Sequence, residues 1–292
     1  MGKESFNQFS DIILGVVAAM LVVVIILGTL YLYTSNWPPM VVVESGSMQH
    51  SSDFAYLGDL NIGDMVLVKK VTSVSQITTY VQGERNGFSS YGEFGNVIIY
   101  RPYGNSSILI IHRAIAYLQY NSTGGGFNIP SLAHLNYSDW FVITPTGDKN
   151  YVSNVIYNVE IKNVGYPHTP VIIPVKEILS INARFSGFIT MGDYNHAHWG
   201  ENSTDQSLGI FPDPVRLQWV VGVATGLLPY FGLIKLFFDG GIPKGTPKNS
   251  IYALVLIIAG VVFLGIGTPE LIRFIKNRRE KNNDLETKKG SD

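Results

Sequence analysis

The amino-acid sequence predicts a mainly β protein, with a coiled β-sheet or barrel-like domain outside the membrane and a transmembrane helix near each end. Two long apolar runs near the chain ends account for much of a hydrophobic content of 46%. Between them lie short runs rich in β-branched and aromatic residues, separated by turn sequences. The chain contains no cysteine, so an exported domain must be stabilised by packing without disulfides.

The first apolar run is long enough to cross a bilayer. Residues 12–33, IILGVVAAMLVVVIILGTLYLY, contain no charged side chain. At 1.5 Å per residue, a helix of this length spans a hydrocarbon core of about 30 Å. A cleaved signal peptide would have a shorter apolar core followed by small residues. The run is therefore predicted to be an uncleaved anchor, preceded by a short cytoplasmic segment at residues 1–11.

A second apolar run, at residues 251–272, is predicted to be the second transmembrane helix. It follows a Gly/Pro-rich linker at 239–250, DGGIPKGTPKNS. The tail at 273–292 begins with RFIKNRREK, whose five basic residues place it in the cytoplasm by the positive-inside tendency. Both termini are then cytoplasmic, and the domain at 34–238 lies on the outer face of the cell membrane in a multi-pass protein.

Two further observations bear on this topology. A third stretch, 217–238, is apolar enough to be a span, and a third crossing would place most of the domain inside the cell. Asn-x-Ser/Thr sequons fall between the two clear spans, as an exported domain allows, although their number is close to that expected by chance. The sequons are at Asn105, Asn121, Asn136 and Asn202.

The middle of the chain is predicted to form strands, because no stretch of convincing length has a helical period. Six runs carry this prediction: DMVLVKKV, NVIIYRPY, SILIIHRAIAYLQY, WFVITPT, NVIYNVEI and PVIIPVKEIL. Turn sequences such as YGNSS, NSTGGG and TGDKN separate them. Several runs are apolar on both faces, which is typical of buried strands in a coiled sheet or barrel.

Chemistry in this domain would have to use serine or threonine as a nucleophile, together with a base and an oxyanion stabiliser. Of the six histidines, only His112 lies inside an apolar strand-like run, ILIIHRAI, where it is either a general base or a buried structural residue. His196, His198 and Glu201 in HAHWGE are a weak candidate for a surface metal site. The net charge of −1 argues against nucleic-acid binding.

The order of several motifs resembles the type I signal peptidases of the archaeal and endoplasmic-reticulum branch, in which histidine replaces the bacterial lysine base. The motifs are an N-terminal span, Ser45-Gly46-Ser47-Met48, GDMVLVKK at 63–70, HRAI at 112–115, GFITMGDYN…STDQ and VVGVATGLLPYFG. The resemblance extends from the first span to about residue 234. It implies a membrane-bound serine endopeptidase that removes signal peptides after Ala-x-Ala-like sites through an acyl-enzyme, without a cofactor or metal.

The resemblance also implies a role for individual residues. Ser47 matches the nucleophile, and Ser45 matches the serine whose hydroxyl forms the oxyanion hole with the Ser47 N–H. His112 matches the general base. Asp193 in GDYN and Asp205 in TDQ match the two family aspartates, either of which could hold the imidazolium in place.

The sequence departs from the family pattern at three places. Gln49-His50 stands where the family often has a proline two residues after Met48, so His50 lies near the nucleophile without matching the base. The two aspartates are 12 positions apart, about twice the usual separation, which leaves Glu201 or Asp193 as stand-ins for Asp205. The stretch 217–238 corresponds to a returning strand and a membrane-facing segment, and Pro229 fits this better than an uninterrupted helix.

Two other candidates for the same chemistry are less favoured. TGDKN, with Asp148, is similar to GDYN but lacks a following aspartate and the VVGVATGLLPYFG motif. Lys69 or Lys70 could be the base of a related Ser–Lys self-cleaving enzyme. Both follow Ser47 too closely, within the strand that GDMVLVKK is predicted to form.

The implied partners are the signal peptides of secretory preproteins, the lipid bilayer and the protein-export translocon. The alternative function is a non-enzymatic, membrane-anchored envelope glycoprotein with a β-rich ectodomain. Composition, spans and sequons fit both functions equally well. Only the order of serine, histidine and aspartate favours the peptidase.

Overall fold

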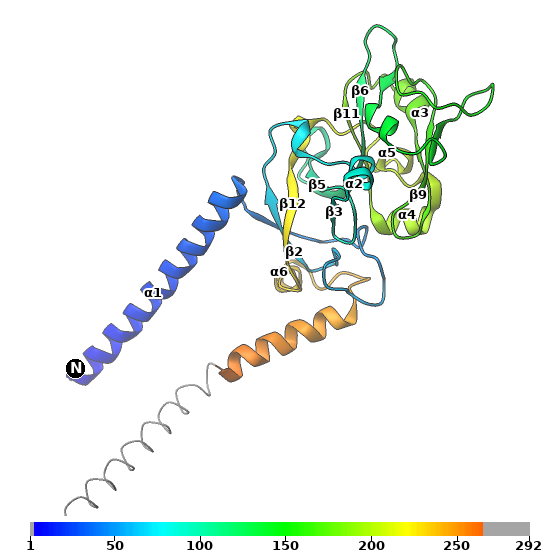
Figure 1. Cartoon of the computed structure of the whole chain (residues 1–292). Helices are drawn as coiled ribbons and strands as arrows, with labels where there is room; N and C mark the ends of the chain where they lie inside the picture. The colour runs from blue at the N-terminus through cyan, green and yellow to red at the C-terminus, as the bar shows by residue number, and fades with distance from the viewer. Residues whose placement is uncertain (1–2, 265–292) are drawn as a thin grey trace, which may run out of the picture.

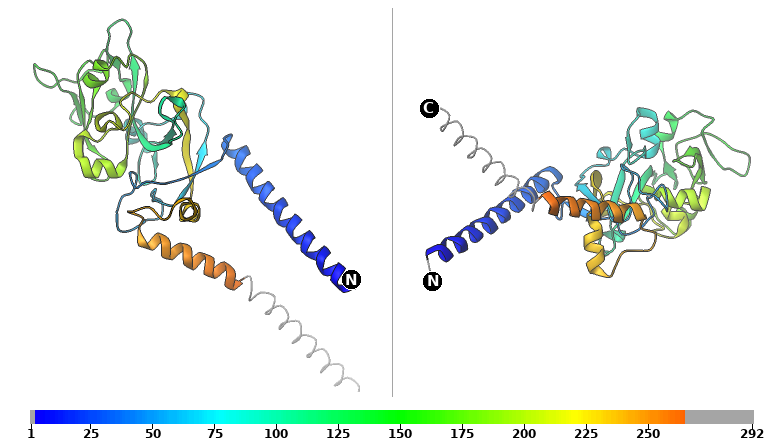
Figure 2. Two further views of the ribbon diagram at one scale, coloured as in Figure 1. Left: turned by 180° about the vertical axis from the view of Figure 1, so that it is seen from behind. Right: turned by 90° about the horizontal axis from the view of Figure 1, so that it is seen from below.

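A computed structural model describes residues 3–264 of the chain, in which a β-rich domain follows a long apolar helix, α1 (Lys3–Thr34). The segment Ile13–Thr34 of α1 has a mean hydropathy of 3.0, and the apolar window that gives it this character contains no buried residue. Thr34, where α1 meets the domain, is buried. A helix that is apolar on all sides is suited to lipid. α1 projects away from the domain (Figures 1 and 2), and by length and composition it can cross a membrane, a test that an N-terminal signal sequence also passes.

The second predicted span is described only in part. An apolar helix covers Lys248–Leu264, which is shorter than the roughly 20 residues that a typical span needs. Residues 265–272 of the predicted span and the basic tail at 273–292 lie outside the described residues. One helix of the described chain is therefore long enough to cross a membrane, and the multi-pass topology stays a prediction.

The largest sheet is antiparallel and contains the strand that carries His112. Its strands lie in the order β1 (Met40–Val42), β2 (Met65–Lys69), β12 (Val220–Leu228), β5 (Val97–Tyr100), β6 (Ile110–Tyr120) and β11 (Gly187–Met191), and β7 (Phe127–Asn128) also pairs with β6. The register places His112 opposite Ile98 of β5. Every residue of β5 and β11 is buried, as expected for runs that are apolar on both faces.

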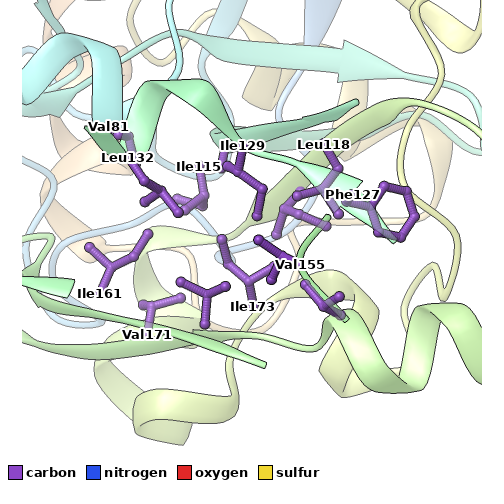
Figure 3. Close-up of a cluster of buried hydrophobic side chains, with 14 of the residues drawn as sticks. Val81, Ile115, Leu118, Phe127, Ile129, Leu132, Val155, Ile161, Val171 and Ile173 are labelled. Atoms are coloured by element: carbon purple, nitrogen blue, oxygen red, sulfur yellow. The ribbon is translucent and has the colours of Figure 1, made fainter. Parts of the chain in front are cut away.

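A second part of the domain packs on β6. It contains the antiparallel sheet β10 (Thr169–Ile173), β9 (Val159–Val164) and β8 (Trp140–Val142), and nearby lies the hairpin β3 (Ser89–Ser90) and β4 (Glu93–Phe94). Side chains of β6, such as Ile115 and Leu118, meet Ile161, Val171 and Ile173 in a buried cluster (Figure 3). This core fixes the C-terminal part of β6, so His112 lies on a strand packed from both sides.

Short helices connect the strands and differ from the predicted all-strand pattern. They are α2 (Tyr80–Asn86), α3 (Val175–Ser180), α4 (Asp193–Trp199), α5 (Asp205–Leu208) and α6 (Gly232–Asp239), with single turns at Val74–Gln76, Pro102–Gly104, Pro130–His134, Gly200–Asn202 and Leu217–Trp219. Each helix has at most eight residues, too few for a helical period to stand out. α3 replaces the second half of the strand predicted in PVIIPVKEIL, because Pro174 ends the strand.

The apolar stretch at 217–238 is not a transmembrane helix. Its first part forms β12, which lies between β2 and β5 in the large sheet. The chain turns at Pro229 and Tyr230 and then forms α6, whose Leu233 and Leu236 are buried against Ile62 and Leu254. The strand agrees with the returning strand that the resemblance implied, and the break at Pro229 agrees with the prediction that the stretch is not one uninterrupted helix. The short helix α6 was not predicted, and the membrane-facing role of this segment stays a prediction.

We expect Ile161→Ala to lower the free energy of unfolding by about 2–5 kcal/mol, because Ile161 is fully buried in the cluster between β6 and the second sheet. Urea denaturation in detergent micelles measures the change. Ile156→Ala, at a side chain that is 41% exposed, is the matched control. Equal stability losses in the two variants would contradict this description of the core.

Candidate active site

Ser47 lies in a tight turn between β1 and β2. The Gln49 N–H donates to the Gly46 carbonyl at 3.0 Å, and the next residue, Met48, is 2% exposed in a core that includes Val43. The Ser47 carbonyl accepts a hydrogen bond of 2.9 Å from the N–H of Tyr194 in α4. A buried neighbour and a backbone bond therefore fix the serine on both sides of its Cα.

His112 joins Ser47 to a carboxylate. Its Nε2 lies 2.9 Å from the Ser47 Oγ, and its Nδ1 lies 2.7 Å and 2.8 Å from the two carboxylate oxygens of Asp205. Since a carboxylate only accepts, the Nδ1–H must donate to Asp205, which leaves the Nε2 of a neutral ring to accept from the serine hydroxyl. This is the donor and acceptor arrangement of a serine–histidine–aspartate triad.

Asp205 is fully buried at the first position of α5 and has three donors. Besides His112, the Tyr100 Oη donates to it at 2.8 Å and the Thr190 Oγ1 at 2.6 Å. Burial alone raises the pKa of Asp205, but the charge of His112 and the three hydrogen bonds outweigh burial and hold this pKa below its ordinary value. The carboxylate is therefore ionised where it faces the imidazole.

Asp193 has a different partner. Neighbouring residues of a strand point to opposite faces, so Arg113 points away from the side of β6 that carries His112. Its Nε and Nη2 bind the two oxygens of Asp193 at 2.8 Å and 2.6 Å. Burial raises the pKa of Asp193, but the Arg113 charge and hydrogen bonds outweigh it and lower this pKa. Of the two candidate aspartates, only Asp205 contacts His112, and the third candidate, Glu201, is exposed.

The remaining predicted residues are placed as follows. The exposed Ser45 has its Oγ 3.3 Å from the Ser47 Oγ, so its hydroxyl lies beside the nucleophile. Lys69 and Lys70 are exposed at the end of β2, and the Lys69 Nζ lies over the ring of Tyr33. His196 is buried and bonds to neighbouring hydroxyl and carbonyl groups. Within residues 3–264, no group of three or more acidic or histidine side chains could hold a metal ion.

The sequence did not indicate three further residues of the site. Tyr100 is a hydroxyl-bearing residue in an apolar strand outside the motifs, and Thr190 lies within GFITMGDYN but had no role assigned to it. Gly192 allows the close approach of α4, because a Cβ added to it would lie 2.6 Å from the Ser47 carbonyl oxygen and 3.0 Å from the His112 Nε2. The Gly-Asp pair that begins GDYN, which is typical of a plain turn, thus lies directly against the site.

A groove of about 680 Å³ opens beside Ser47 and His112. One wall is β1 with the residues that follow it, and the other is the segment 107–112. Most of the lining is apolar, including Met40, Val42, Met65 and Ile108. A mostly apolar groove that is lined by Ser47 and by a histidine bonded to a buried carboxylate can bind an apolar ligand beside a nucleophile.

No protein-family model matches the sequence, and no curated protein matches it significantly. The chemistry of the site therefore has to be inferred from its own residues and geometry.

We expect Asp193→Asn to lower the free energy of unfolding by about 3–5 kcal/mol near neutral pH, because the buried Arg113 charge loses its partner. A carboxyl whose pKa is lowered by folding stabilises the protein above its unfolded pKa and loses this contribution as the pH falls. The difference between wild type and variant should therefore shrink below about pH 4. Urea denaturation near neutral pH and below about pH 4 measures this difference, and Asp53→Asn, at an exposed side chain, is the control. A pH-independent difference would contradict the ion-pair assignment.

Proposed function

We propose that this protein is a membrane-anchored serine endopeptidase that removes signal peptides from exported preproteins after small-residue, Ala-x-Ala-like sites. The single observation that carries the proposal is the continuous hydrogen-bonded chain from the Ser47 Oγ through His112 to the buried Asp205. It ends at an apolar groove and lies in a domain that follows an apolar helix. The order of motifs along the sequence supports the same family.

In the proposed mechanism, the neutral His112 takes the proton of Ser47 as the Oγ attacks the scissile carbonyl. The charge on the carbonyl oxygen is stabilised by the Ser45 hydroxyl and the Ser47 N–H. His112 then protonates the leaving amine, and the N-terminal product stays on Ser47 as an ester. A water molecule that gives its proton to His112 hydrolyses the ester and frees the enzyme. Asp205 stabilises the imidazolium in both steps.

The two walls of the groove have open strand edges that suit an extended substrate. Val43 directs both its N–H and its carbonyl toward the β2 side, so alternation turns those of Val42 and Glu44 toward the groove. On β6, the Ala114 N–H bonds to the Asn96 carbonyl on the β5 side. By alternation, the N–H and carbonyl of Ile111 point away from β5, and β11 has no residue paired with Ile111. A peptide can add to these edges as a further strand, with its carbonyl beside Ser47.

The proposed substrate shares the bilayer with the enzyme, which raises their effective concentration. The Thr34 carbonyl at the end of α1 accepts a hydrogen bond from the Lys70 N–H just after β2, and Ser47 lies in the turn that joins β1 to β2. α6 carries exposed Ile234, Phe237 and Phe238, a surface that favours contact with lipid. The proposed orientation has the domain on the outer face, both termini in the cytoplasm and a second span that begins in the helix Lys248–Leu264.

The direct test is cleavage of a preprotein that carries an Ala-x-Ala signal, with enzyme and substrate reconstituted in the same lipid vesicles. We expect a cut directly after the small-residue site, mapped by mass spectrometry. Ser47→Ala should abolish the cut, and the exposed Ser52→Ala should leave it unchanged. Failure of the folded wild type to cut would contradict the proposal.

We expect the triad variants to differ in a graded way. Ser47→Ala and His112→Ala should lose most of a rate enhancement of about 10⁶-fold, and Asp205→Ala should lose less, because it orients the base without reacting. Asp193→Ala should be impaired to a different degree, through its link to Arg113 and not through His112. Single-turnover rates of preprotein cleavage measure these effects. Equal activity in all four variants would reject the triad.

We expect Gly192→Ala to lower kcat by about 10- to 100-fold with little change in KM, because its Cβ would displace the Ser47 backbone and the His112 ring. The same preprotein assay measures both constants. Gly28→Ala is the control, since a Cβ there meets nothing within 4 Å. Wild-type kcat in Gly192→Ala would show that α4 does not position the serine.

A further inference from the structure

His50 lies three residues after Ser47 and faces a carboxylate at each ring nitrogen. Its Nδ1 is 3.2 Å from the Asp59 Oδ2, and its Nε2 is 3.3 Å from the Asp193 Oδ2. An ionised carboxylate can only accept a hydrogen bond, so both ring nitrogens are satisfied only when both carry a proton. The geometry around His50 therefore requires the imidazolium form.

The surroundings of His112 favour the opposite protonation state. One of its nitrogens faces Asp205, but the other faces the Ser47 hydroxyl, which can donate a hydrogen bond. A neutral ring satisfies both partners, and the proposed reaction needs that neutral ring. The site thus places two histidines near one serine, one arranged to be neutral and the other to be charged.

The ring of His50 is enclosed by groups from several elements. Its centroid lies 4.6 Å from that of Tyr166, and a Cβ added to Gly92 would lie 2.8 Å from its Cε1. The charged and titratable groups that face it are Asp59 from the loop before β2, Glu93 of β4, Arg113 of β6, Tyr166 from the turn between β9 and β10, and Asp193 of α4. When His50 is protonated, its charge and that of Arg113 together balance the charges of the two closest carboxylates, Asp59 and Asp193.

The pKa values of His50 and Asp193 agree with this charge balance. Burial alone lowers the pKa of His50, but the hydrogen bond and charge of Asp193 and the charge of Asp59 outweigh burial and raise it above the ordinary histidine value. Burial raises the pKa of Asp59 above its ordinary value, and the charge of His50 reduces that rise without cancelling it.

The cluster is connected to the nucleophile by the backbone of α4. Asp193 binds His50 through its side chain, and the N–H of the next residue, Tyr194, binds the Ser47 carbonyl. The turn that carries Ser47 is therefore attached to the start of α4 at two points, one before and one after Met48. Loss of the charge on His50 would leave Asp59 and Asp193 facing an uncharged ring and weaken one attachment.

We propose that His50 is a positioning residue, whose protonated ring links Asp59 to Asp193 and thereby holds Ser47 in line with His112. The inference rests on the proposed function and adds a form of regulation to the same site. A histidine whose pKa is raised by folding makes its contribution at low pH and loses it as the pH rises through the raised pKa. Activity then falls on the alkaline side as His50 loses its proton.

The kinetic test compares His50→Gln with wild type in the preprotein assay over a range of pH. We expect kcat to fall by about 10- to 100-fold near neutral pH with a KM within about twofold of wild type. The fall of kcat on the alkaline side, the alkaline limb, should disappear. The exposed His134→Gln should behave as wild type. Wild-type kcat, or an unchanged alkaline limb in His50→Gln, would overturn the proposal.

A second measurement needs neither activity nor a folded variant at position 50. Histidine NMR titration of the full chain in micelles, as Ser47→Ala, reads the His50 ring directly. We expect His50 to titrate above about 6.5, and Asp59→Asn to move this titration downward. A titration at or below the ordinary value would overturn the proposal even if the peptidase is active. Absence of preprotein cleavage together with a raised titration would instead reject the proposed function.

Discussion

The buried carboxylate of Asp205 is the constraint on which the arrangement of the site depends. An ionised group at 0% exposure is tolerated only when its oxygens have donors. The donors come from three strands, through Tyr100 of β5, His112 of β6 and Thr190 of β11. Satisfying one charge thus fixes the distances between three neighbouring strands and α5, and the imidazole is held where the Ser47 hydroxyl can reach it.

β6 separates two buried charged clusters with different tasks. On one face His112 meets Asp205 and the nucleophile. On the other, Arg113 binds Asp193 and five carbonyls of the β3–β4 hairpin region. Since adjacent residues of a strand point to opposite faces, the His-Arg pair alone directs one side chain to each cluster. α4 then brings the clusters together again, because Asp193 and Tyr194 are adjacent and contact Arg113 and Ser47.

Much of the fold could be predicted from the sequence, because runs that are apolar on both faces identify buried strands. β2, β5, β6 and β8 lie within predicted runs, and Pro229 correctly indicated that 217–238 is not one helix. The short helices could not be foreseen, since one or two turns carry no period. The second span remains a prediction, because only part of its helix lies within the described residues.

The sequence placed Ser47, His112 and Ser45 near one another but could not choose between the two aspartates. The 12 positions from Asp193 to Asp205 contain α4 and a single helical turn, and these reverse the chain so that each carboxylate reaches a different face of β6. The number of residues between two aspartates does not show which face of a strand each one reaches. Tyr100 and Thr190 were missed for a related reason, because a hydroxyl in a buried strand becomes informative only when its acceptor is known.

The proposed mechanism requires that Ser47 becomes acylated, and acid-quench mass spectrometry detects such an acyl-enzyme. A peptide ester that ends in Ala-x-Ala should acylate the enzyme faster than the acyl group is hydrolysed, so the adduct should accumulate. We expect the mass of the acyl group to be added to the proteolytic fragment that contains Ser47, and we expect Ser47→Ala to show no adduct. Ester hydrolysis without an adduct on Ser47, or an adduct that persists in Ser47→Ala, would contradict the proposed mechanism.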